Sequence, residues 1–79
     1  RATVKAVPAL AAALKDRAPR VRASAALALG NIGAPSDAAV PAILAALKRG
    51  PEEVSWSAAL ALGLIGTPRA RKAFERSRR

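Results

Sequence analysis

Apolar residues recur along the chain at the spacing of an α-helix. Between residues 39 and 50 they fall at i, i+3, i+4 and i+7, at Val40, Ile43, Leu44 and Leu47. This spacing gives a helix one apolar face. A matching stripe near the N-terminus consists of Val7, Leu10 and Leu14. Both stripes predict helices that pack on a common core.

Residues that start and stop helices lie at the ends of these stripes. Ser36 or Asp37 is expected to cap the helix that carries the second stripe, because short polar side chains satisfy free N–H groups. Gly50 ends that helix, and Pro51 is expected as the first residue of the next one. The two glutamates that follow face the positive end of its dipole. Pro19 plays the same part earlier in the chain.

Ten residues of the chain occur twice with a single change. SAALALGNIG at 24–33 returns as SAALALGLIG at 57–66, with Asn31 replaced by Leu64. The same offset of 33 residues relates 6–33 to 39–66, where 18 of 28 positions are identical. A repeat of this length is typical of a solenoid in which each unit is one supersecondary element.

We therefore predict an all-α fold, an α-solenoid of two antiparallel helix pairs followed by a fifth helix. Gly33 and Gly66 end the second helix of each pair, and Thr67 caps the fifth helix with Pro68 as its first residue. The inner side of that helix carries Ala70, Ala73 and Phe74. The predicted units are repeat 1 over residues 1–33, repeat 2 over 34–66, and a capping helix with a basic tail over 67–79.

The repeat AVPALAAALKDRAPRVRASAALALGNIG resembles a HEAT-like repeat of the short prokaryotic kind grouped with the phycobilisome lyases. The matching elements are V-P-A-L and K-D in the first helix and V-R-x-x-A-A-x-A-L-G-x-I-G in the second. The resemblance covers 6–66 strongly and 67–75 weakly. It implies the fold and says little about activity, because such repeats serve many tasks. The lyase activity of some relatives is not expected here.

Two departures from the family pattern concern the ends of the array. The resemblance implies that Asp16 and Arg22 bridge neighbouring repeats, whereas the second unit has Arg49 and Ser55 there. The loss of both partners suggests that nothing similar stacks beyond the second unit. A polar fifth helix agrees with a terminal cap. A piece of a longer array, or an oligomer, is the other expectation, since a core of small side chains leaves little surplus stability.

The free positions of the second helix in each pair suggest a binding surface. The resemblance implies that they point to the concave side: Ala23, Ser24, Leu27, Asn31, Trp56, Ser57, Leu60 and Leu64. Trp56, Leu60 and Leu64 share one helix face that is not the core stripe. We predict that they bind a protein partner with Trp56 as the anchor, because tryptophan is enriched at interface hot spots. Self-association through the same face, and simple packing of Leu27 on Leu60, remain alternatives.

The net charge of +9 is unevenly placed. Residues 1–68 contribute +4 and the last eleven residues contribute +5. Phosphate contacts need such basic clusters, so nucleic-acid binding is the alternative function. The uncharged helix face described above weakens it. The candidate phosphate contacts are Lys15, Arg17, Arg20, Arg22, Arg69, Arg71 and Lys72.

The composition offers little for catalysis or metal binding. The chain has no cysteine and no histidine, and three of its five acidic residues fall at expected helix starts. We therefore predict a protein that is not an enzyme and has no cofactor or metal. The longest uncharged run, residues 54–68, is too short to cross a membrane. A cytoplasmic protein without a membrane partner is the expectation.

Overall fold

The computed structural model describes residues 4–78 and confirms the all-α fold. Within that range there is no strand, and the five expected helices are present. Residues 1–3 of the first predicted repeat and Arg79 of the predicted tail lie outside the described residues. The elements are the 3-10 helix η1 (Val4–Ala6), α1 (Val7–Ala13), α2 (Pro19–Ile32), the 3-10 helix η2 (Ala34–Ala39), α3 (Val40–Arg49), α4 (Glu52–Ile65) and α5 (Pro68–Ser77).

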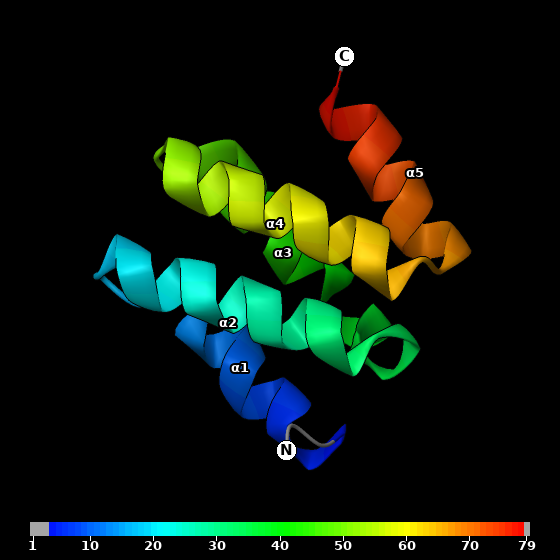
Figure 1. The fold of residues 1–79 in the computed structure, drawn as a ribbon, viewed down its shortest axis with the longest axis horizontal. Coiled ribbons are helices and arrows are strands. Elements are labelled where there is room, and N and C mark those ends of the chain that lie inside the picture. The colour runs from blue at the N-terminus through cyan, green and yellow to red at the C-terminus, as the bar shows by residue number, and fades with distance from the viewer. Residues whose placement is uncertain (1–3, 79) are drawn as a thin grey trace.

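The helices form two layers. α2 and α4 lie side by side and run in the same direction, with α3 behind α4 (Figure 1). α1 pairs with α2 as α3 pairs with α4, and α5 packs against both α3 and α4. The result is a slab of 33 × 28 × 15 Å. Each repeat therefore contributes one helix to each layer.

The core consists of the predicted apolar stripes and of alanines that let the helix axes approach. Val40 and Ile43 are buried, while Leu44 and Leu47 pack against the core from its edge. In the front layer, which α2 and α4 form, the largest fully buried side chains are Leu29, Val54 and Leu62. Small residues such as Ala26, Ala58 and Ala61 fill the space between helices, so backbones come close.

Most helix ends follow the sequence signals. Pro19 begins α2, and the second helices end at Gly33 and Gly66, whose φ angles are 85° and 67°. Such positive φ angles suit glycine, which has no Cβ. The hydroxyl of Thr67 caps α5 by accepting a hydrogen bond from the Ala70 N–H at 3.1 Å. Pro51 precedes α4 by one residue instead of being its first residue.

The predicted capping role of Ser36 and Asp37 is wrong. Both residues lie in η2, and α3 begins later, at Val40, without a side-chain cap. Ser36 is buried, and its hydroxyl donates a hydrogen bond of 2.7 Å to the Leu29 carbonyl at the end of α2. Asp37 accepts a hydrogen bond from Thr67. The two side chains therefore join η2 to neighbouring helices, a use that competes with capping.

The predicted bridge from Asp16 and Arg22 to the next repeat is also wrong. The Arg22 guanidinium donates to the carbonyls of Asp16 and Arg17 at 2.8 and 3.2 Å, so it closes its own α1–α2 turn. In the second repeat Ser55 does the same for the α3–α4 turn, donating to the Leu47 carbonyl at 2.7 Å. The change from Arg22 to Ser55 is thus another way to close a turn. It removes no contact between repeats.

Candidate partner-binding face

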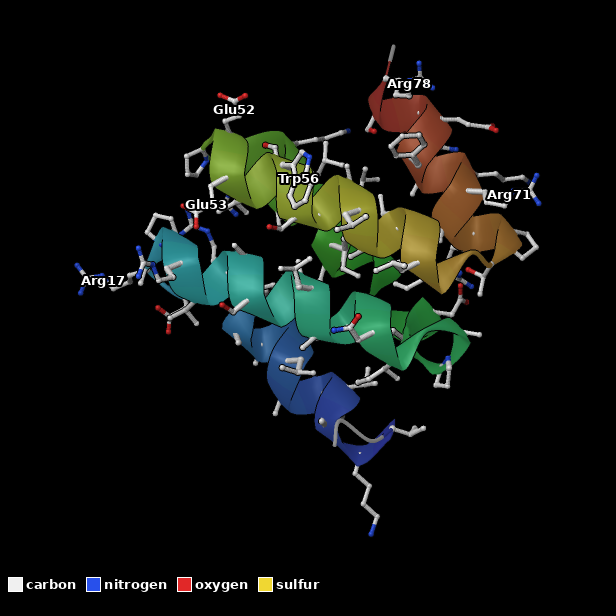
Figure 2. All side chains as sticks on the ribbon, viewed as in Figure 1. Arg17, Glu52, Glu53, Trp56, Arg71 and Arg78 are labelled. Atoms are coloured by element: carbon white, nitrogen blue, oxygen red, sulfur yellow. The ribbon has the colours of Figure 1, made fainter. Side chains whose placement is uncertain are left out.

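The largest exposed apolar side chain belongs to α4. Trp56 is 64% exposed, and Leu60 and Leu64 on the same helix are 39% and 48% exposed. Together with Ala59, Gly63 and Phe74 of α5 they line an open groove of about 360 Å³. We call it the α4–α5 groove. Figure 2 shows Trp56 standing on α4 with its ring in solvent.

The eight residues predicted to form one surface are divided by the fold. Ser24 and Asn31 are exposed on α2, and Leu27 is half-buried. Ala23 and Ser57 are only 5% and 3% exposed, so they offer no side-chain surface to a partner. Their assignment to the binding face is wrong. Trp56, Leu60 and Leu64 stay exposed, as expected from the sequence.

Packing of α4 on α2 explains the burial of Ala23 and Ser57. A Cβ added to Gly30 of α2 would come within 2.9 Å of the Ala61 Cα of α4, so the two backbones nearly touch there. Ala23 lies seven residues before Gly30, about two helical turns, and Ser57 lies four residues before Ala61. Both therefore belong to the faces that meet. Among the free positions of α2, Ala23 therefore points at α4, whereas Ser24 and Asn31 are exposed.

The repeat register shows what the exposed face of α4 is. The counterparts of Ala23 and Gly30 in the second repeat are Trp56 and Gly63. In the first repeat this face is covered by the next helix of the front layer. In the second it is open, because among residues 4–78 no atom lies within 4 Å of a Cβ added to Gly63. Trp56 thus lies on the end face of the stack.

At the opposite end of the stack the matching positions of α2 are polar, and this accounts for the one change between the repeated decamers. A Cβ added to Gly30 would lie 3.1 Å from the Leu64 Cδ1, so Leu64 leans across to α2. Its counterpart Asn31 would lean the same way from α2, where no helix of the described chain lies. Asn31 is accordingly exposed, with exposed Ser24 beside it.

The predicted phosphate contacts form two separate groups. Lys15, Arg17, Arg20 and Arg22 lie in the α1–α2 turn or the first turn of α2, whereas the α5 group begins at Arg69. Arg17 and Arg71 mark opposite edges of the molecule (Figure 2). Arg69 is engaged by Asp37, with a distance of 3.2 Å between its Nε and the carboxylate oxygen. The seven residues therefore do not make one continuous surface.

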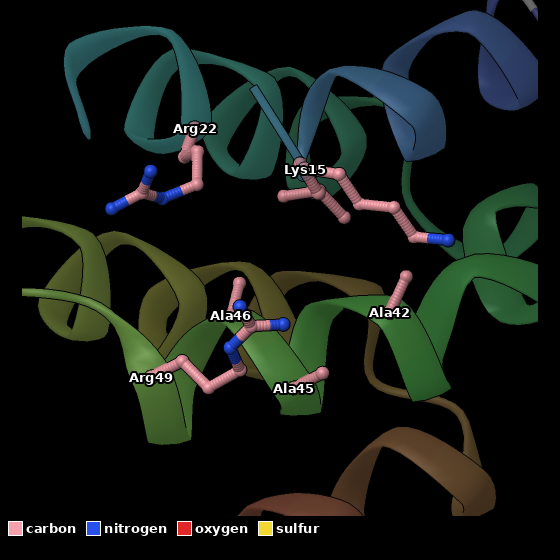
Figure 3. A pocket seen from close by; sticks show the side chains of 7 residues that line it. Lys15, Arg22, Ala42, Ala45, Ala46 and Arg49 are labelled. Carbon is pink, nitrogen blue, oxygen red and sulfur yellow. The ribbon is translucent and has the colours of Figure 1, made fainter. Parts of the chain in front are cut away.

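A third basic residue joins part of the first group. Lys15 and Arg22 reach into a pocket of about 260 Å³ from one side and Arg49 from the other (Figure 3). Its remaining lining residues are apolar: Leu14, Ala42, Ala45 and Ala46. None of the described residues that line the pocket is acidic. Arg17 and Arg20 are not among these residues. We call this site the basic pocket.

One comparison decides the family. The sequence pattern described as HEAT repeats matches residues 7–79. The chain belongs to the HEAT-repeat family. HEAT repeats are in general non-catalytic and commonly serve as scaffolds for protein interactions. The finer resemblance to the phycobilisome-lyase type stays a prediction. The chain has no significant match among curated proteins.

None of the helices between residues 4 and 78 has the length and apolar character needed to cross a bilayer. The same residues contain no cluster of three potential metal-ligating side chains.

Sequence reasoning missed two contributors to these sites. Phe74 packs against the core, as expected for the inner side of the fifth helix, but it is only half-buried and also forms the α5 wall of the groove. Arg49 was seen only as a lost bridge partner. The repeat register could have indicated the role of Arg49, because Arg49 is the counterpart of Asp16, the residue that follows Lys15 in the first turn. Turns of successive HEAT repeats lie at one edge, so these residues come together.

Proposed function

We propose that this HEAT-repeat chain is a non-catalytic interaction module that binds a partner protein through the α4–α5 groove. The observation that carries the proposal is the exposure of Trp56, at 64%, beside Leu64 and the open Gly63. A tryptophan that a protein leaves in water gains most of its hydrophobic stabilisation only when a partner covers it. Exposed apolar patches that line a groove are typical of interaction sites.

Packing within the chain supports the same interpretation. α5 already contacts α3 and α4 and buries its own Ala70 and Ala73. The groove nevertheless remains open between α4 and Phe74. The apolar side chains of α4 in the groove therefore stay exposed although α5 packs on the same helix.

A capture experiment with matched variants tests this function. The immobilised chain is incubated with extract of the cells that naturally express it, and Leu60→Ser is compared with Val21→Ser. Both side chains are 39% exposed and apolar, but only Leu60 lines the groove. We expect specific proteins to be retained by the wild type and by Val21→Ser, and lost from Leu60→Ser and Trp56→Ser. Equal retention by all four chains would contradict the proposal.

A second candidate function rests on the basic pocket. Three cationic side chains around one concave site, without an acidic neighbour among the described lining residues, suit a ligand that carries phosphates, such as a nucleic acid. Titration of labelled duplex and single-stranded oligonucleotides at two salt concentrations tests it. Affinity should fall steeply with salt and should weaken further in Arg49→Ala, but much less in Arg17→Ala, which lies outside the pocket. Absence of binding at low salt removes this candidate.

A further inference from the structure

We propose that the α4–α5 groove accepts an amphipathic α-helix of a partner protein, which lies along α4 as α4 lies along α2 and carries acidic side chains on the edge next to α5. The inference rests on the proposed function and specifies the binding element. It follows from the repeat register, from the open space at Gly63, and from the charges around the groove.

The first step is the equivalence of two helix faces. The α2 face that receives α4 and the open α4 face have the same spacing of small and apolar residues, with Ala26, Leu27 and Gly30 in α2 and Ala59, Leu60 and Gly63 in α4. The α2 face is occupied along its length by a helix that runs in the same direction. A surface with the same pattern and backbone geometry is therefore suited to a helix as well.

Gly63 supplies the second step. In α2, Gly30 permits the close approach of Ala61, because a Cβ there would clash at 2.9 Å. Glycine inside a helix costs about 1 kcal/mol relative to alanine. At Gly63 nothing in the described chain uses the space that this glycine leaves. A docked helix would use it, since the absence of a Cβ lets two helix backbones meet.

The third step concerns the residue where the two faces differ. Trp56 stands where α2 has Ala23, which is buried beneath α4. A helix over Trp56 must present small side chains at that end, so that the indole ring can lie between the two helices. The large apolar residues of the partner then belong near Gly63 and Phe74. The partner helix is therefore amphipathic, with small side chains at the Trp56 end and large apolar side chains at the end near Gly63 and Phe74.

Charge decides between a foreign helix and a second copy of the chain. Arg78 lies four residues after Phe74, and its guanidinium lies 5.6 Å from the centroid of the Phe74 ring, which forms the α5 wall of the groove. An acidic side chain on the partner would face this guanidinium. On α4, Glu52 lies four residues before Trp56, so the acidic edge of the partner belongs next to α5.

A second copy fits the groove less well. Its net charge of +9 would be brought against another +9, with Arg78 beside the groove. Stacking in the repeat register also requires the first helix of that copy to pack on α3, where α5 already lies. A single helix with an acidic edge meets neither obstacle.

Two synthetic peptides serve as probes. Both keep the apolar and small positions with which α4 packs, and all remaining positions are glutamate in the acidic probe and lysine in the basic probe. The retained residues are the buried ones, Val54, Ser57, Ala58, Ala61, Leu62 and Ile65, together with Leu64, which leans across to α2. The chain contains a single tryptophan, and the probes contain none, so the emission of Trp56 reports occupation of the groove directly. Sedimentation of the chain alone measures self-association.

We expect the acidic probe to shift Trp56 emission to shorter wavelength and the basic probe to bind at least tenfold more weakly. Gly63→Ala should weaken the acidic probe about tenfold, the change that roughly 1.4 kcal/mol of steric cost produces. Its added methyl group meets no described atom of the chain, so the fold stays intact. Val21→Ser is the control that should leave binding unchanged.

Each other result overturns the inference in a recognisable way. Binding that ignores Gly63→Ala means that no helix lies over this residue. If neither probe shifts Trp56 while protein capture still depends on Trp56, the partner element is not a helix and only the proposed function stands. A concentration-dependent dimer that Gly63→Ala abolishes identifies the occupant as a second copy. If capture is also independent of Trp56, both proposals fail.

Discussion

Gly30 and Ala61 lie against each other where the two repeats pack: a Cβ added to Gly30 would lie 2.9 Å from the Ala61 Cα. The neighbouring atom is backbone and cannot rotate away. Thirty-three residues later, a Cβ added to Gly63 would meet no described atom within 4 Å. Two glycines with equivalent places in the sequence therefore have opposite environments.

This contrast predicts opposite effects of the same substitution. Gly30→Ala should lower the free energy of unfolding by roughly 1–3 kcal/mol, because overpacking outweighs the gain in helix propensity. Gly63→Ala should raise it by up to about 1 kcal/mol, since only the propensity gain remains. Urea denaturation followed by circular dichroism measures both. Destabilisation by Gly63→Ala would mean that another part of the chain fills that space.

The repeat pattern was sufficient to predict the fold, because a doubled decamer at a constant offset allows few arrangements. Helix ends were also predictable where a residue has one strong local preference, as at Pro19, Gly66 and Thr67. The prediction failed at Ser36, which was equally suited to capping α3 and to bonding the Leu29 carbonyl. Only the three-dimensional position of η2 decides between these local partners.

The single difference between the repeated decamers leads to a second pair of variants. Leu64→Asn should lower the free energy of unfolding by about 1 kcal/mol, because the half-exposed leucine packs against Gly30. Asn31→Leu should change it by less than about 0.5 kcal/mol, since Asn31 is exposed and no described helix covers it. Thermal and urea unfolding provide the comparison. A clear gain from Asn31→Leu would indicate that this end face is covered.

The binding face was predictable only in part. Helical spacing placed Trp56, Leu60 and Leu64 on one face outside the core stripe, and all three are exposed. The same reasoning wrongly added Ala23 and Ser57, because it treated both second helices as equivalent. In a short stack they are not equivalent, since one face of α2 receives α4 while the matching face of α4 is open.

The wall of the groove formed by α5 depends on the cap at its first turn. The Thr67 hydroxyl donates to the Asp37 carboxylate and accepts from the Ala70 N–H, and Arg69 pairs with the same carboxylate. Thr67→Ala should cost about 1 kcal/mol and act mainly on α5. Amide hydrogen exchange should therefore accelerate in α5 more than in α2. Thr67→Ser keeps the hydroxyl and should leave exchange nearly unchanged, so similar acceleration in both variants would contradict a capping role.

The last prediction separates binding from stability at Trp56. Because the side chain is 64% exposed, Trp56→Ala should lower the free energy of unfolding by less than about 1 kcal/mol. Leu62→Ala removes a fully buried side chain of the same helix and should cost roughly 3 kcal/mol. In the wild type at low protein concentration, Trp56 should emit like an indole in water and be quenched freely by acrylamide. Acrylamide quenching and urea unfolding of these chains are the measurements. An emission already shifted to shorter wavelength at that concentration, together with a large loss of stability in Trp56→Ala, would place Trp56 in the core and leave the groove without its anchor.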